Sequence, residues 1–181
     1  MEAKKGFLLR TIFLTIISLG FFCINSCGDR PDKPAAVSSI TVLYDTLINF
    51  NQQVVQQESQ EIDDFIRRYQ WKMKTTQTGL RYMIYQHGAG KPARKGDLVS
   101  IHYSLSLLNG ALIYKTDSLV PFRFDIGKRK VTRGLEEGVL LMKPGDRAKL
   151  VVPSHLGYGL IGDQAMVPER AILVYDVIFV R

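Results

Sequence analysis

Apolar residues follow two different spacings along the 181-residue chain. Between residues 46 and 76 they recur every three or four positions, which predicts an amphipathic helix or a pair of helices. We call these positions the apolar stripe; they are Leu47, Phe50, Val54, Ile62, Phe65, Tyr69 and Met73, and only Glu58 interrupts them. Such a stripe packs on its own domain, which is the interpretation we favour, or on a second copy of the chain or a client polypeptide.

From residue 79 onward, apolar and polar residues alternate in short runs, which is typical of strands. The alternation predicts strands at residues 80–86, 98–107, 122–124, 147–152 and 171–180. Helical spacing predicts one short helix at residues 133–142, and Asn109-Gly110 predicts a hairpin because both residues tolerate a positive φ. Residues 77–181 are therefore expected to form an α+β domain, with an antiparallel sheet curled over one short helix and the helical segment 46–76 before it.

The first 26 residues have the pattern of a secretory signal, because Lys4, Lys5 and Arg10 precede a short apolar run. The sequence Ile24-Asn-Ser-Cys27 resembles a bacterial lipobox, so Cys27 is the predicted site of lipidation and residues 27–45 the tether. These features predict a membrane-anchored lipoprotein of the cell envelope that faces the periplasm. Two alternatives stay open: an uncleaved anchor over residues 7–24, just long enough to span a bilayer, and Cys23 and Cys27 as ordinary thiols.

Charge adds little to this picture. Lys and Arg number 24 against 17 Asp and Glu, a surplus of seven positive charges that is scattered along the chain. The densest basic runs, at residues 91–95 and 128–130, lie beside Gly or Pro and are typical of solvated turns. They lack the interleaved aromatic residues of a single-strand binder, so we do not expect nucleic acid as a partner.

Several blocks within residues 77–181 occur in an order that resembles a known family. They are Val99-Ser-Ile-His-Tyr103, residues 131–138 and 142–149, Pro153, Gly157-Tyr158-Gly159, Val167-Pro168 and residues 173–177. Together they resemble the FKBP-type peptidyl-prolyl cis-trans isomerase domain. With the helical segment and the Cys27 leader, the chain is also similar to the FKBP-type lipoproteins associated with bacterial gliding motility.

The resemblance implies a site for a prolyl residue. Tyr103, Phe122 and Tyr158 would be the catalytic residues, with the Tyr158 hydroxyl donating a hydrogen bond to the substrate carbonyl. The resemblance also implies a set of substrate-binding residues, namely Tyr114, Phe124, Val131, Thr132, Leu135, Val167 and Tyr175. Leu135 stands at the pocket floor, where many relatives have Trp. Taken singly, each apolar residue of this set is better explained as core, and only their joint match to one family favours a site.

One position departs from the family pattern. Many relatives carry Asp after the aromatic residue that corresponds to Tyr114, and its carboxylate lies near the tyrosine hydroxyls. Here that position is Lys115, which cannot accept their hydrogen bonds, so we expect weakened activity. Asp117 compensates only if the strand contains a bulge.

Prolyl isomerisation breaks no bond. Twisting the amide costs about 18–20 kcal/mol, and a pocket that desolvates the carbonyl lowers this barrier without a nucleophile, metal or cofactor. We therefore predict an isomerase that assists the folding of exported envelope proteins, with proline-containing polypeptides as clients. The alternative is a noncatalytic FKBP-like binding module or scaffold in an envelope or motility assembly. A second copy of the chain is a further predicted partner, in a homodimer formed through residues 47–73.

Overall fold

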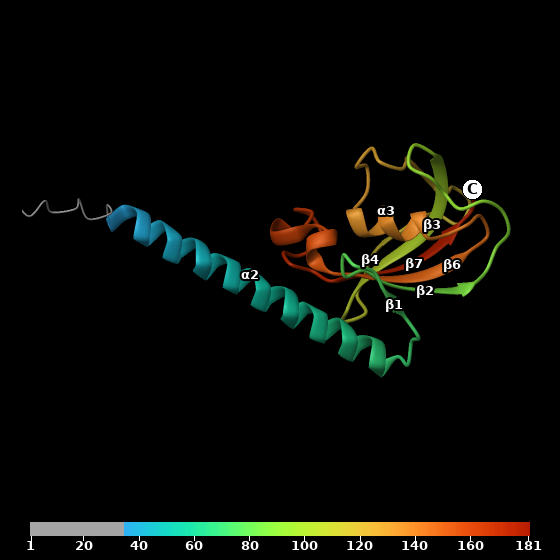
Figure 1. Cartoon of the computed structure of the whole chain (residues 1–181). Helices are drawn as coiled ribbons and strands as arrows, with labels where there is room; N and C mark the ends of the chain where they lie inside the picture. The colour runs from blue at the N-terminus through green and yellow to red at the C-terminus, as the bar shows by residue number, and fades with distance from the viewer. Residues whose placement is uncertain (1–34) are drawn as a thin grey trace, which may run out of the picture. The chain divides into compact units, whose positions relative to one another are not determined.

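The computed structural model describes the backbone of residues 35–181 and the side chains from residue 40 onward. The predicted signal peptide, Cys27 and most of the predicted tether lie outside the described residues. Within the described residues, helix α2 (Ala35–Arg68) precedes a domain of seven strands with one short helix (Figure 1). Residues Asn49–Arg181 form one compact unit, which includes the second part of α2. No helix in the described part of the chain is long and apolar enough to cross a membrane.

The limits of α2 differ from the predicted helical segment 46–76. The helix begins at Ala35, inside the predicted tether, directly after Pro34. It ends at Arg68 in a Schellman turn: the Gln70 N–H bonds the Arg67 carbonyl, the Trp71 N–H bonds the Ile66 carbonyl, and Gln70 has a φ of 55°. The apolar stripe continues past this turn. Apolar spacing depends on which side chains pack toward the core, so it does not indicate where the helical backbone ends.

All the strands pair antiparallel in one sheet. The strands are β1 (Lys74–Thr75), β2 (Arg81–Gln86), β3 (Leu98–Leu107), β4 (Leu112–Lys115), β5 (Phe122–Asp125), β6 (Arg147–Val152) and β7 (Leu173–Phe179). Their order is β1-β2-β6-β7-β3-β4, and β5 pairs with the first half of β3. This arrangement confirms the predicted α+β fold, and β1 and β4 are short strands that the alternation did not indicate.

Helix α3 (Arg133–Leu140) packs against the sheet at close range (Figure 1). Its contact face carries Gly134 and Gly138, where an added Cβ would come within 2.4 Å of the side chains of Val152 and Leu150. Any larger residue at these two positions would push the helix off the sheet, so the glycines fix the separation of the two layers. The main core lies between them.

The second part of the apolar stripe packs on its own domain, as we favoured. Ile62 and Phe65 are buried against Val151 of β6 and Ile172, in a core cluster separate from the main one. Tyr69 and Trp71, which follow the helix, pack around Phe65 in tilted and edge-on arrangements, with ring centroids 4.7 and 5.4 Å from it. Leu47 and Phe50 are exposed. The homodimer through residues 47–73 stays a prediction.

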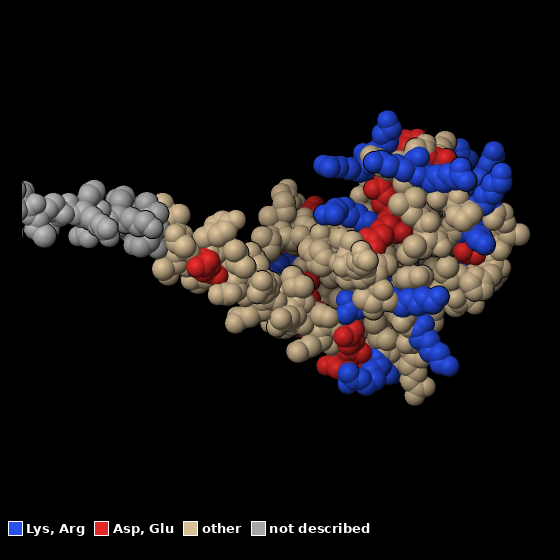
Figure 2. Space-filling view, in the orientation of Figure 1, with Lys and Arg blue, Asp and Glu red and all other residues tan. Residues whose placement is uncertain are grey.

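Lys and Arg are spread over the visible face of the domain and are interspersed with Asp and Glu (Figure 2). The two densest basic runs, however, meet in the folded chain. Residues Lys95 and Gly127 adjoin, because a Cβ added to Gly127 would lie 3.0 Å from the Lys95 Cγ atom. Runs that read separately as solvated turns therefore form one basic edge beside the start of α3.

Candidate prolyl-binding site

Four aromatic rings from three strands form a connected cluster. The Tyr103 ring of β3 lies 5.9 Å from the Phe122 ring of β5, nearly perpendicular to it, and also 5.9 Å from the Tyr175 ring of β7. The ring of Phe124 lies 6.1 Å from that of Phe122. These rings meet because β3 pairs with both β5 and β7, which brings residues distant in the sequence onto neighbouring strands.

We call the buried residues of this cluster and of the core packed around it the floor. It consists of Phe124, Thr132, Leu135, Val167 and Tyr175, each at most 9% exposed. Thr132, the residue before α3, shares a hydrogen bond of 3.2 Å with the Tyr175 hydroxyl. Burial raises the pKa of Tyr175 well above its ordinary value, so this hydroxyl stays protonated. The floor residues belong to the main core as much as to the site.

We call the accessible residues of the site the rim. Tyr103, Tyr114, Val131 and Tyr158 are half-buried against the core, and Phe122 is 37% exposed. Tyr103 and Tyr158 both have raised pKa values, with burial as the main cause in each case. The rim hydroxyls are therefore neutral at physiological pH and can donate hydrogen bonds to a carbonyl.

Tyr158 sits in a loop that local hydrogen bonds hold in shape. The loop begins after Pro153 with the short helix η1 (Ser154–Leu156), and Tyr158 directly precedes a second short helix, η2 (Gly159–Ile161). The Gly157 N–H bonds the Ser154 carbonyl at 2.9 Å, and the Arg170 N–H bonds the Gly159 carbonyl at 2.8 Å. These bonds fix the backbone on both sides of Tyr158.

One residue of this site, Asp163, was not predicted from the sequence. One of its carboxylate oxygens accepts a short hydrogen bond from the Tyr114 hydroxyl, and the other accepts the backbone N–H groups of Ala165, Met166 and Val167. Chiefly because of the bond from Tyr114, its pKa is lowered to about 2. The same bond, together with burial, raises the pKa of Tyr114 to about 12. Asp163 thus joins strand β4 to the loop that carries Val167.

The sequence signal at Asp163 is only local and does not indicate a site. Gly162-Asp163 is a common turn pair, in which the Asp side chain bonds backbone N–H groups a few residues on. Nothing in the sequence related it to Tyr114, 49 residues earlier.

The structure places Lys115 on the exposed side of β4, opposite Ser104 of β3. The register of β3 and β4 shifts between Leu105 and Ser106, opposite Tyr114 and Leu112; this irregularity comes before Lys115 and does not bring Asp117 to the tyrosines. The Asp117 carboxylate instead accepts the Leu119 N–H at 2.7 Å and so closes its own turn. The carboxylate beside a rim hydroxyl comes from Asp163.

A separate hollow of about 360 Å³ lies on the other face of the sheet. Among its strand residues, His102, Ser104 and Asp176 alternate with Tyr103 and Tyr175 and therefore point away from the cluster. Tyr103 is the only predicted site residue that borders this hollow. Among residues 40–181, no three His, Cys, Asp or Glu side chains gather as a metal site would require.

Comparison with known proteins identifies the family. The family described as FKBP-type peptidyl-prolyl cis-trans isomerase matches residues 89–180. The chain belongs to this family. The resemblance expected from the sequence blocks is therefore confirmed, and the matched residues contain the whole floor and rim.

Similar proteins agree with this family. The chain is 40% identical over 105 residues to peptidyl-prolyl cis-trans isomerase FKBP1A of Xenopus laevis, covering 57% of this chain and 97% of that protein. It is 37% identical over 109 residues to a probable FKBP-type peptidyl-prolyl cis-trans isomerase of Haemophilus influenzae, covering 58% of this chain but 43% of the relative. The crystal structure of AtFKBP13 superposes with a TM-score of 0.57 at 25% identity, covering 61% of this chain and 98% of that one.

Proposed function

We propose that this protein is a peptidyl-prolyl cis-trans isomerase and that the rim of the aromatic cluster holds the substrate proline. The observation that carries the proposal is the contact of the Tyr103 and Phe122 rings, with Tyr158 packed against the same buried core, in a chain of the FKBP-type family. Such a surface suits a prolyl ring, which is apolar, and a peptide carbonyl, which needs a donor.

Catalysis on this surface would work by environment. Placing the X-Pro amide against the floor removes water from its carbonyl, and the twisted amide loses less solvation than the planar one because it is less polar. Phe122 and Tyr103 would exclude water from the sides. The Tyr158 hydroxyl, which its raised pKa keeps protonated, would donate a hydrogen bond to the carbonyl as the amide twists.

Lys115 counts against activity because it replaces the carboxylate that many relatives carry near the tyrosine hydroxyls. Asp163 provides a carboxylate there from another part of the chain. A carboxylate next to a rim tyrosine restrains that hydroxyl, and Asp163 takes this part with Tyr114. Because it also accepts three backbone N–H groups of its own loop, it would hold two sides of the rim at a fixed separation. Activity in this chain would then not depend on a carboxylate at position 115.

The cellular role rests on the leader alone. We infer that the isomerase acts on exported proteins in the cell envelope, held to the membrane by a lipid on Cys27. Mass spectrometry of detergent-extracted protein should find a diacylglyceryl adduct on Cys27, and Cys27→Ser should abolish it. An intact, unacylated leader recovered in the membrane fraction would contradict this inference.

The deciding experiment for the enzyme is exchange NMR on a prolyl tetrapeptide with a protein of residues 28–181. We expect the cis-trans exchange rate of the peptide to rise in proportion to protein concentration. Peptide binding without any rate increase would instead support the alternative, a noncatalytic module, for which the exposed Lys115 at the usual Asp position is the motivating observation. Loss of both would exclude the site.

A further inference from the structure

Glu58, the charged residue that interrupts the apolar stripe, is buried and engaged with the loop of Tyr158. It is 7% exposed. One carboxylate oxygen accepts the Ser154 backbone N–H at 3.1 Å and the other accepts the Ser154 hydroxyl at 2.6 Å. The partners are 96 residues apart in the chain, so this contact is a tertiary link between helix α2 and the start of η1.

We propose that Glu58 is a positioning residue for Tyr158, so that the docked part of α2 belongs to the catalytic unit. This inference rests on the proposed isomerase activity. Ser154 is four positions before Tyr158, and the intervening backbone is closed by the bonds of Leu156 and Gly157 back to Pro153 and Ser154. A rigid turn of this length transmits the position of its first residue to its last.

The physical reason for a carboxylate at this position lies in the two donors that it receives. The Ser154 N–H and hydroxyl are both buried, and a buried donor without a partner is costly. An apolar residue at position 58 would continue the stripe and bury well, yet it would leave both donors unsatisfied. The turn would then move to reach water, and Tyr158 would move with it.

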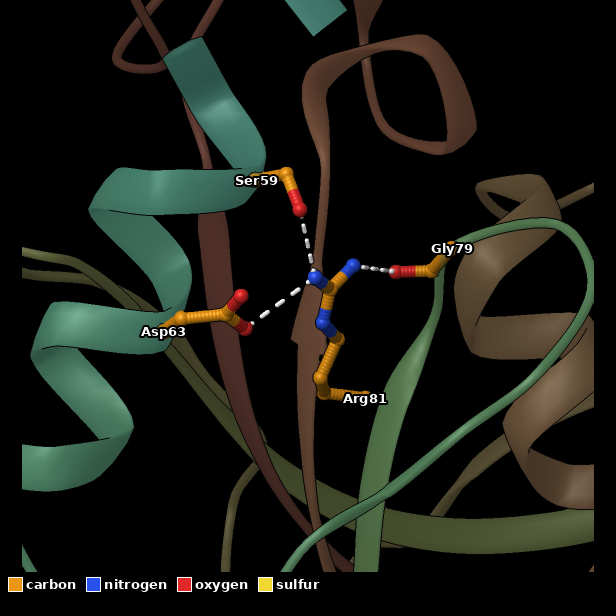
Figure 3. Close-up of polar contacts among 4 residues, drawn as sticks. All are labelled: Ser59, Asp63, Gly79 and Arg81. Carbon is orange, nitrogen blue, oxygen red and sulfur yellow. Dashed lines mark hydrogen bonds and ion pairs between the residues drawn. The ribbon is translucent and has the colours of Figure 1, made fainter. Parts of the chain in front are cut away.

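The neighbouring side of α2 makes a second polar contact, in which Ser59 and Asp63 bond Arg81 and not Ser154 (Figure 3). The buried Arg81 of β2 bonds Ser59 at 2.7 Å and Asp63 at 3.1 Å, and it also bonds the Gly79 carbonyl at 2.7 Å. Removing Ser59 and Asp63 weakens the docking of α2 on β2. It therefore provides a matched control for the general loss of docking.

The test compares three variants in the protein of residues 28–181. Glu58→Ala removes both acceptors, and we expect kcat/KM on the prolyl peptide to fall roughly tenfold, since misplacing a positioned donor has effects of this order or larger. Glu58→Gln should stay within about twofold, because its amide oxygen can accept the Ser154 N–H and its amide N–H can donate to the hydroxyl. The double variant Ser59→Ala/Asp63→Ala should lose stability but keep its kcat/KM.

Amide hydrogen exchange provides a readout that does not depend on activity. Glu58→Ala should speed exchange at Ser154 and Gly157, while the Ser59→Ala/Asp63→Ala control should leave these two amides protected at a temperature where both variants are folded. Unchanged kcat/KM in Glu58→Ala, or an equal loss of kcat/KM in the control, would overturn the positioning role.

The failure of the proposed function would look different. If the wild-type protein has no isomerase activity, the enzyme proposal fails, and the exchange rates of Ser154 and Gly157 alone then decide whether Glu58 positions the loop. Exchange at these amides that is the same in wild type and Glu58→Ala would overturn the inference whatever the activity.

Discussion

The floor and the rim of the aromatic cluster are built from similar residues but differ in burial. Phe124 and Tyr175 in the floor are 0% and 2% exposed, whereas Phe122, two positions from Phe124 on the same strand, is 37% exposed. The floor side chains therefore hold the domain together, and the rim side chains are available to a ligand. Neighbouring residues of one aromatic cluster can therefore have different roles, stability for the floor and function for the rim. Substitutions in the floor and in the rim should separate these two roles.

The largest effect is expected from truncating the floor. Phe124→Ala should lower the free energy of unfolding by about 3–5 kcal/mol, because it opens a cavity in a fully buried position. Urea denaturation followed by tryptophan fluorescence would measure this loss. A loss below about 1 kcal/mol would place Phe124 with the rim instead.

Truncating the rim should do the reverse. Phe122→Ala should reduce kcat/KM by more than about tenfold, since it removes the wall that excludes water from the substrate amide. Its stability should change far less than that of Phe124→Ala because Phe122 is partly exposed already. Measuring both quantities on one preparation tests the division directly, and equal losses of stability in the two variants would contradict it.

Removing a single rim hydroxyl should have a smaller effect. Tyr158→Phe should lower kcat/KM a few-fold to about tenfold, because a neutral hydrogen bond contributes about 0.5–1.5 kcal/mol. Tyr175→Phe is the matched floor variant, since it deletes a buried hydroxyl that bonds Thr132. It should leave kcat/KM close to that of the wild type, and exchange NMR on both would show whether hydroxyls of floor and rim differ.

The hydrogen bond between Asp163 and Tyr114 should make the stability of the rim depend on pH. The Asp163 pKa of about 2 lies below its unfolded value of about 3.9, so its contribution to stability is present above pH 4 and is lost as the pH falls toward 2. The Tyr114 pKa of about 12 lies above its unfolded value of about 10, so its contribution is lost only as the pH rises through 12.

Amide exchange at Val167 would follow this link. We expect protection that is constant between about pH 4 and 10 after correction for the intrinsic exchange rate, with a decrease below that window. Asp163→Asn should remove the acid dependence and lower kcat/KM a few-fold at most. If Asp163→Asn keeps the wild-type loss of protection at low pH, another titrating group causes that loss.

The smallest effect is expected at position 115. Lys115→Asp should raise activity if this position faces the tyrosine hydroxyls, as the family alignment suggested. In the structure Lys115 is exposed and Asp163 already bonds Tyr114, so we expect kcat/KM to stay within about twofold. An increase of tenfold would show that the family carboxylate is missing here after all.

The sequence by itself determined the short helix and five of the seven described strands, all but β1 and β4. Strands β3 and β6 have the predicted limits, 98–107 and 147–152, because alternation of apolar and polar side chains is a local property of a half-buried strand. Helix α3 was predicted to within two residues at its end for the same kind of reason. The site residues were named only because their blocks match a family; the spacing of Tyr103 or Phe122 alone distinguishes neither from core.

Only the tertiary structure decided which polar groups act together. Glu58 interrupts the apolar stripe and Asp163 was not singled out at all, yet Glu58 accepts hydrogen bonds from a partner 96 positions away and Asp163 from one 49 positions away. The tertiary structure also decided that Ile62 and Phe65 are buried while Leu47 and Phe50 of the same stripe are exposed. Periodicity fixes the face on which a side chain lies, but its partner depends on which surfaces the folded chain brings together, and no local pattern encodes that.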